Sequence, residues 1–215
     1  MPVFALASAL AAPPRPLDPS LLPAFPKGFE GRVHEVCDVE LLTQEDGREE
    51  VLTLEGCHEP FLAAIRDRLR WWTWRYVDAP VDDLLDRTHA VLTAPGDVPV
   101  GLYTRFQVVF EKGAGDVEPT VAFVPVSVVE LRKKSRIDLP ADVAARAGAG
   151  CDLVMHVSAE GRVVRVQTES CADAVQAAVE LPTMLGWTFE ELRLAGEPKA
   201  FAVRLHVAGT GPGGI

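Results

Sequence analysis

Hydrophobic and polar residues alternate along two stretches of the chain that are bounded by cysteines. Cys151 to Cys171 (CDLVMHVSAEGRVVRVQTESC) contains an alternating strand, a turn at 159–162 and a Val-rich return strand, which together predict a β-hairpin. Cys37 to Cys57 (CDVELLTQEDGREEVLTLEGC) has the same length and the same Gly-Arg in its turn, at one offset (151 − 37 = 114). A run of matches at one offset, which includes all four cysteines, predicts an internal duplication.

Each hairpin is followed by a helical pattern and then by an alternating final strand. Residues 58–70 place Phe61, Ile65 and Leu69 on one apolar stripe and predict a helix, and residues 172–181 predict its counterpart. The final strands are expected at 102–110 and 200–207. We therefore expect an α+β fold of two tandem small domains. Each would have a β-hairpin, a helix and a final strand, forming an antiparallel sheet with the helix packed on one face.

Proline, glycine and small residues mark the expected boundaries. The apolar run at 1–12 has the composition of a signal-peptide remnant, and a disordered tail rich in Ala and Pro is the alternative. The Pro-rich lead-in at 13–31 is expected to be extended, without helix or sheet. The remaining expected segments are the first domain (32–112) with an insertion (77–99), a linker or extended connector (113–137), the second domain (138–208) and a disordered tail (209–215).

Composition limits the classes of function. The net charge is −10, which argues against a general nucleic-acid binder, because such proteins need a basic face. No apolar run approaches the roughly 20 residues that a membrane-spanning helix needs. No phosphate-binding glycine loop and no metal-ligand spacing occurs, so we expect neither a cofactor nor a metal.

The matched cysteines predict the disulfides Cys37–Cys57 and Cys151–Cys171, since closing each hairpin brings its two ends together. In the first hairpin, simple alternation places Cys57 and the apolar residues of the return strand on opposite faces, whereas Cys37 lies on the apolar face. A bulge or a register offset is therefore needed to bring the two cysteines together. Four buried reduced thiols are the alternative. Disulfides would imply an oxidising compartment, periplasmic or extracellular.

Aromatic residues gather after the first helix, at Trp71, Trp72, Trp74 and Tyr76. They would either close the core where the helix gives way to a strand or form a stacking platform for a ligand.

The ordered motifs resemble those of the TonB C-terminal domain family. In the second copy they are Glu160-Gly161-Arg162-Val163, Glu169-Ser170, Trp187-Thr188-Phe189 and Gly196-Glu197-Pro198. In the first copy they are Asp46-Gly47-Arg48, Glu55-Gly56, Trp74-Arg75-Tyr76 and Gly96-Asp97-Val98-Pro99-Val100. The resemblance covers most of 24–112 and 138–208.

The resemblance implies a periplasmic protein that binds an extended peptide by adding it to the edge of a sheet, as in energy transduction to outer-membrane transporters. The edge implied for the second copy carries Ala200, Phe201, Val203, Leu205 and Val207, with Leu102 to Phe110 as its counterpart. The chain is acidic and shows neither an anchor nor a long spacer, so we expect an adaptor rather than a complete energy transducer.

Two other functions compete with this prediction. The first is a structural tandem-repeat protein whose copies bury their own edges, without a role in transport. The second is a cysteine-dependent enzyme built on His34, Cys37 and Asp38. His34 and Cys37 differ in strand parity and would lie on opposite faces, so we do not expect an enzyme.

Overall fold

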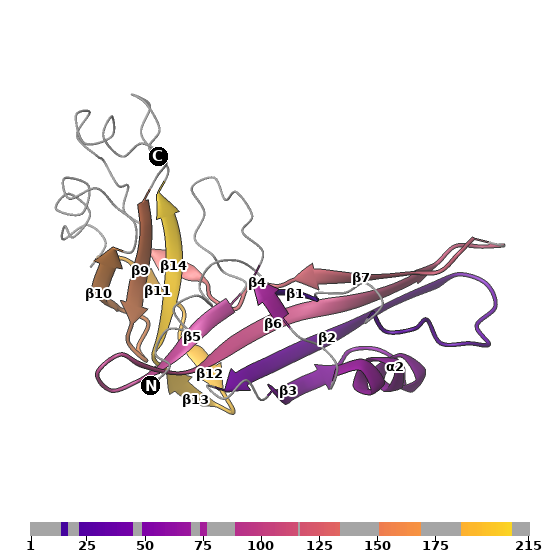
Figure 1. The fold of residues 1–215 in the computed structure, drawn as a ribbon, viewed down its shortest axis with the longest axis horizontal. Coiled ribbons are helices and arrows are strands. Elements are labelled where there is room, and N and C mark those ends of the chain that lie inside the picture. The colour runs from indigo at the N-terminus through magenta and orange to yellow at the C-terminus, as the bar shows by residue number, and fades with distance from the viewer. Residues whose placement is uncertain are drawn as a thin grey trace, which may run out of the picture.

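A computed structural model describes residues 14–16, 22–44, 49–69, 74–76, 89–115, 117–133, 151–168 and 186–207. Within these ranges the protein is mostly β, with one short helix. The predicted α+β fold of two tandem domains is wrong, because eight described strands from both halves of the chain form one antiparallel sheet (Figure 1). The strand that joins the two halves lies in the segment 77–99, which the sequence predicts to be an insertion.

The main sheet has the strand order β10-β9-β14-β5-β6-β2-β3, and β7 pairs with the far part of β6. Its strands are β2 (Val33–Gln44), β3 (Glu49–Glu55), β5 (His89–Ala94), β6 (Val98–Lys112), β7 (Thr120–Pro125), β9 (Cys151–Val157), β10 (Val163–Thr168) and β14 (Phe201–Val207). The strands β9, β10 and β14 run at a steep angle to β2, β3, β6 and β7, so the sheet bends near β5 (Figure 1).

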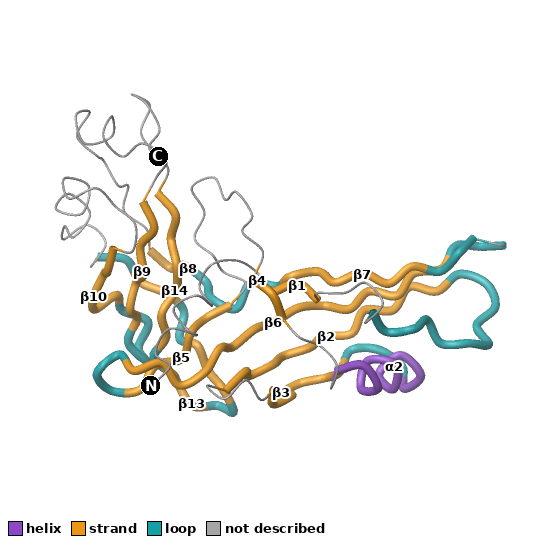
Figure 2. Tube along the Cα trace, viewed as in Figure 1, coloured by secondary structure: helices purple, strands orange, loops and turns teal. Residues whose placement is uncertain are grey.

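Three short strand pairs and the helix α2 (Glu59–Leu69) accompany the main sheet (Figure 2). The pairs are β1 (Pro14–Pro16) with β4 (Trp74–Tyr76), β8 (Leu131–Lys133) with β11 (Thr188–Phe189), and β12 (Leu192–Leu194) with β13 (Glu197–Lys199). The Pro-rich lead-in therefore does contribute a strand, in a two-stranded pair where proline can lie at an edge. The expected linker contributes β7 and β8.

The strand β5 lies within the expected insertion and occupies the centre of the sheet. Residues 89–92 are all buried, so both faces of the strand are covered. A strand that is buried on both faces shows no alternation of apolar and polar residues. This is why the sequence pattern did not reveal it.

The sheet has two faces, which we name by the residues of β2. Face 1 carries Cys37, Val39 and Leu41, and face 2 carries Asp38, Glu40 and Leu42. Directly opposed residues share a face, so the register extends this assignment across the sheet.

The two halves of the sheet bury opposite faces. In the first half the core lies on face 1, where α2 and Phe25 and Phe29 pack; its buried members are Cys37, Val39, Leu41, Phe61, Ile65, Leu69, Phe106, Val108 and Phe110. In the second half the core lies on face 2, where β11 and β12 pack; its buried members on the sheet include Leu92, Leu153, Met155, Val157, Phe201 and Val203.

The strand order is the same from either end. On each side of β5 come a final strand (β6 or β14), the inner strand of a hairpin (β2 or β9) and its outer strand (β3 or β10). A twofold axis along β5 would exchange these strands, keep their directions and turn face 1 into face 2. This is the arrangement expected of two copies of one unit, and it accounts for the change of buried face.

Several predicted elements can be compared directly with the structure. The hairpin β9–β10 is confirmed, with Gly161 at φ +77° in its turn. The first helix and the final strand of the second copy are confirmed as α2 and β14. The segments 1–12, 172–181 and 209–215, together with Cys171, lie outside the described residues.

Candidate functional site

Carboxylates gather on face 2 of the strands β2 and β3. Asp38 and Glu40 of β2 lie opposite Glu55 and Thr53 of β3, and beyond a bulge Glu50 lies opposite Leu42 on the same face. Arg105 of β6 lies opposite Glu40. We call the group Asp38, Glu40, Glu50 and Glu55 the acidic face.

Two of these carboxylates are held by neighbours on the sheet. The Asp38 carboxylate accepts a hydrogen bond from the Gln107 amide at 3.1 Å, and the Glu40 carboxylate accepts one from the Thr53 hydroxyl at 2.9 Å. The Arg105 guanidinium lies 3.9 Å from Asp38 Oδ1 and 3.6 Å from Glu40 Oε1. Arg105 is thus shared between the two carboxylates of β2.

Tyr103 lies beside the acidic face at the start of the second core. Burial and then the neighbouring Glu40 carboxylate, which its hydroxyl contacts, raise the pKa of Tyr103 well above its ordinary value. Tyr103 therefore stays protonated and acts as a hydrogen-bond donor toward Glu40. It does not supply a base at neutral pH.

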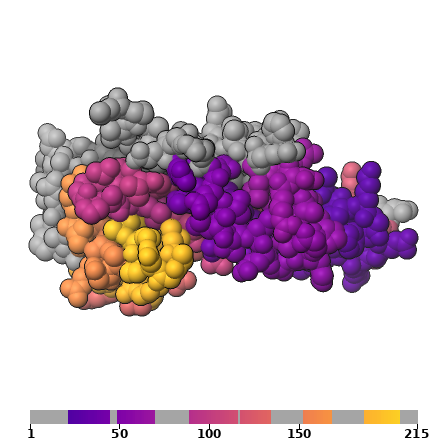
Figure 3. Space-filling view, turned by 90° about the horizontal axis from the view of Figure 1, so that it is seen from below, coloured from indigo at the N-terminus to yellow at the C-terminus, as the bar shows by residue number. Residues whose placement is uncertain are grey.

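The other two carboxylates, Glu50 and Glu55, lie on β3, the last strand of the sheet. Both side chains are exposed. No cation among the described residues lies within ion-pair distance of either of them. Residues 49–69, drawn in purple, lie on the side of the molecule that faces the viewer in Figure 3.

The strand β3 also exposes apolar side chains. Val51 is 43% exposed and Leu52 is 37% exposed, both in the middle of β3. No described strand pairs with the outer edge of β3 along residues 50–55. An edge strand of this kind presents unpaired N–H and C=O groups to another chain.

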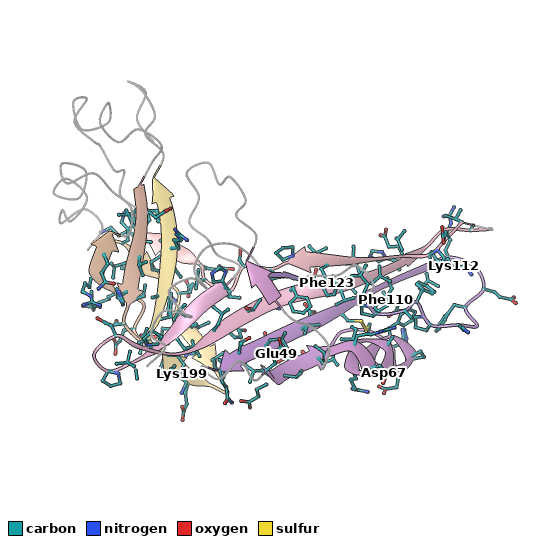
Figure 4. The ribbon with its side chains drawn as sticks, in the orientation of Figure 1. Glu49, Asp67, Phe110, Lys112, Phe123 and Lys199 are labelled. Atoms are coloured by element: carbon teal, nitrogen blue, oxygen red, sulfur yellow. A yellow bond between two sulfur atoms is a disulfide. The ribbon has the colours of Figure 1, made fainter. Side chains whose placement is uncertain are left out.

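A disulfide joins β2 to the connection between β3 and α2. Cys37 and Cys57 are bonded with their Cα atoms 4.9 Å apart (Figure 4). The parity problem is solved at Gly56, whose φ of +91° breaks the alternation and brings Cys57 to face 1. A Cβ on Gly56 would lie 3.1 Å from the Val36 carbonyl oxygen, so the chain passes close to β2 there. The second predicted disulfide stays a prediction.

A glutamate of β2 anchors the start of the helix beside this disulfide. The Glu35 carboxylate accepts hydrogen bonds from the His58 backbone N–H at 3.2 Å and from His58 Nδ1 at 2.7 Å. Burial opposes ionisation of Glu35, but the hydrogen bonds from His58 outweigh it and hold the pKa of this carboxyl below its ordinary value. The contacts secure α2 against face 1.

The partner-binding residues predicted on the last strand lie mainly in the core. The side chains of Phe201, Val203 and Leu205 are buried in the second core, and Ala200 is half-buried just before β14. The strand, up to Val207, pairs with β9 along its length, and β5 pairs with it at Phe201 and Ala202.

The predicted counterpart, Leu102 to Phe110, is an interior part of β6. It pairs with β2 on one side and with β5 and β7 on the other. It offers no edge to a peptide.

A second polar cluster joins the turn between β5 and β6 to the hairpin of the second copy. Arg165 donates to Asp97 at 2.8 Å, and the buried His156 places Nδ1 3.5 Å from Asp97 Oδ1 and Nε2 3.0 Å from Gln167 Oε1. The contacts are internal and connect the two halves. They indicate a structural role.

The chemistry expected of an enzyme is not assembled around Cys37. Its sulfur is in the disulfide, and His34 instead contacts Glu111 at 3.1 Å on face 2. Among the described residues, no group of three or more His, Cys, Asp or Glu side chains could hold a metal ion. No described helix has the length and apolar character to cross a membrane.

Comparison with protein-family models, with curated proteins and with solved structures finds no match to this chain. The resemblance to TonB C-terminal domains therefore stays a prediction.

Sequence reasoning missed the acidic face. Its signal was the spacing of Asp38 and Glu40 on one strand and of Glu50 and Glu55 on the next. Simple alternation places Glu50 and Glu55 on opposite faces, and only the bulge between Glu40 and Leu41 brings them together.

Proposed function

We propose that this protein is a non-enzymatic binding protein that takes up an extended peptide segment of a partner along an edge of its sheet. The observation that carries the proposal is the open outer edge of β3, where Val51 and Leu52 are exposed on a strand with no further described strand beside it. Main-chain hydrogen bonds to such an edge supply affinity, and the side chains that flank it supply specificity.

The place and the wider role of the protein come from the family resemblance. We propose a periplasmic or extracellular adaptor, and the Cys37–Cys57 disulfide supports an oxidising compartment. A segment of an outer-membrane transporter is the partner that the resemblance implies, which would connect the protein to energy-dependent transport.

A second candidate function is that of a structural protein which buries its own edges. The pairing of the final strands favours it, since β6 is flanked on both sides and β14 pairs with β9 along its length and with β5 at Phe201 and Ala202. On this view the edge of β3 is a solvated border, and the acidic residues there prevent pairing with other chains.

Hydrogen exchange of the full chain separates the two candidates. Short peptides that alternate apolar residues with lysine, threonine or glutamate are added, and the amides of β3, β7, β10 and β14 are followed by mass spectrometry. A binding protein shows slower exchange on at least one of these strands with at least one peptide. Unchanged exchange on all four strands with every peptide would reject the binding function in favour of the structural one.

A further inference from the structure

We infer that the outer edge of β3 is the binding strand and that its ligand is an extended peptide in which basic residues alternate with apolar ones. This inference rests on the proposed function and specifies its site and its ligand. It is drawn from three features of the described residues: which side chains of β3 share a face, which charges are already neutralised, and where apolar surface is open.

The first feature is the division of side chains between the faces of β3. Glu50, Thr53 and Glu55 point to face 2, whereas Glu49, Val51 and Leu54 point to face 1. A strand added beside β3 repeats this division, because directly opposed residues share a face. Along residues 50–55, the added strand would therefore place one set of side chains beside the carboxylates of Glu50 and Glu55 and the other set beside aliphatic groups.

The second feature is an excess of negative charge on face 2. The four carboxylates of the acidic face lie on β2 and β3, and Arg105 of β6 lies between two of them, Asp38 and Glu40. Glu50 and Glu55 remain without a described cation. Lysine or arginine on the incoming strand would be opposite these two glutamates, at the separation where cross-strand pairs of opposite charge are stabilising.

The third feature is the open apolar surface on the same strand. Leu54 packs against the first core and Val51 is 43% exposed on the same face. The bulge residue Leu52 is 37% exposed at the edge. Apolar residues of the peptide would cover this surface and extend the first core outward, next to α2, whose exposed Asp67 is labelled in Figure 4.

The other outer strands lack this combination. The strand β7 carries no charged side chain and ends at Pro125. The strand β10 carries one charged side chain, Arg165, which is basic and already paired with Asp97, so it offers no carboxylate to a basic peptide. A second copy of this chain is disfavoured as the ligand at β3, because pairing two such edges would bring glutamates against glutamates.

The experiment measures binding of the lysine, threonine and glutamate peptides to the full chain by fluorescence anisotropy, and locates the binding by hydrogen exchange. We expect the lysine peptide to bind most tightly, to protect amides of β3, and to bind more weakly as salt is raised. The double variant Glu50→Gln/Glu55→Gln should weaken it about tenfold, the combined effect of two exposed charge pairs. The reversal Glu50→Lys/Glu55→Lys should abolish it and favour the glutamate peptide.

A matched control changes the same number of charges elsewhere. Glu118 and Glu130 are exposed and lie away from β3, in the segments that flank β7. The variant Glu118→Lys/Glu130→Lys should bind the lysine peptide with an affinity within about twofold of that of the original chain, because salt screens the interaction between distant exposed charges. An equal loss in this control would show that net charge alone drives binding and would overturn the inference.

The outcomes keep this inference separate from the proposed function. Protection of β7 or β10, or a preference for the threonine or glutamate peptide in the original chain, would overturn the inference while the binding function stands. If the chain self-associates and the variant Glu50→Gln/Glu55→Gln strengthens this self-association, a second copy of the chain would be identified as the ligand of the β3 edge, and the inference would also be overturned. The absence of binding by every peptide would reject both.

Discussion

Leu92 of β5 lies directly opposite Phe201 of β14, and both side chains are buried in the second core. This pair and its neighbour, Val91 opposite Ala202, are the register pairs through which the two halves form one sheet. Phe201 also meets Phe189 edge to face, with ring centroids 5.9 Å apart. The join between the halves is therefore part of the hydrophobic core.

We predict that the variant Leu92→Ala destabilises both halves together. Removal of a buried leucine side chain costs about 2 to 5 kcal/mol, and a shared core transmits this loss to the whole sheet. Hydrogen exchange in denaturant should show β2 and β9 losing protection at one common, lowered midpoint. A lowered midpoint for β9 with an unchanged one for β2 would mean that the halves unfold separately. Val164→Ala, at a 57% exposed position, should leave both midpoints within about 0.5 kcal/mol.

Removal of the disulfide should weaken the first half of the sheet. Cys37 and Cys57 are 20 residues apart, and cross-linking a loop of this size stabilises a protein by about 3 kcal/mol. The variant Cys37→Ala/Cys57→Ala should lower the urea midpoint accordingly. An unchanged midpoint would contradict a stabilising cross-link. Titration of the unfolded, unreduced chain should find no free thiol, and titration after reduction should find four. Two free thiols before reduction would contradict the predicted Cys151–Cys171 disulfide.

Alanine at Gly161 should be much more harmful than alanine at Gly96. Both glycines have positive φ, +77° and +84°. A Cβ at Gly161 would lie 2.2 Å from the Phe189 carbonyl oxygen, whereas nothing lies within 4 Å of one at Gly96. Gly96→Ala should cost about 1 kcal/mol from the left-handed backbone alone. Gly161→Ala should cost at least about 1 kcal/mol more, because the backbone of 186–190 must move. Equal midpoints in thermal unfolding would show that the close approach is absent in solution.

Acid should weaken the attachment of α2 through Glu35. Its pKa is lowered in the folded protein by the hydrogen bonds from His58, which outweigh burial. Its stabilisation is therefore complete above the unfolded value of 4.5 and is lost as the pH falls through the lower folded value. Glu35→Gln should cost about 1 kcal/mol at neutral pH, where a charge-assisted bond is replaced by a neutral one. The difference between the variant and the original chain should shrink below pH 4.5 in urea unfolding; a difference that does not change with pH would contradict this role.

The elements that depend on local pattern could be predicted from the sequence. The hairpin β9–β10 follows from alternation around a glycine turn, and α2 follows from the stripe of Phe61, Ile65 and Leu69. These signals arise within a few residues, so they survive without knowledge of the rest of the fold.

The assembly of these elements could not be predicted in the same way. The pairing of Leu92 with Phe201 spans more than half of the chain, and β5 has no alternation because both of its faces are covered. The acidic face depends on one bulge, which shifts Glu50 by one position relative to Glu55. Long-range pairing and a one-residue shift leave no regular signal in the composition or the period of the sequence.

The twofold order of strands around β5 has a consequence for how such a chain can arise. A single hairpin with its final strand would leave one side of that strand open, and two separate molecules would have to meet to cover it. The stability of such a pair would depend on protein concentration. Linking the two units in one polypeptide, with β5 between them, makes the association intramolecular, so the sheet forms equally well in a dilute solution.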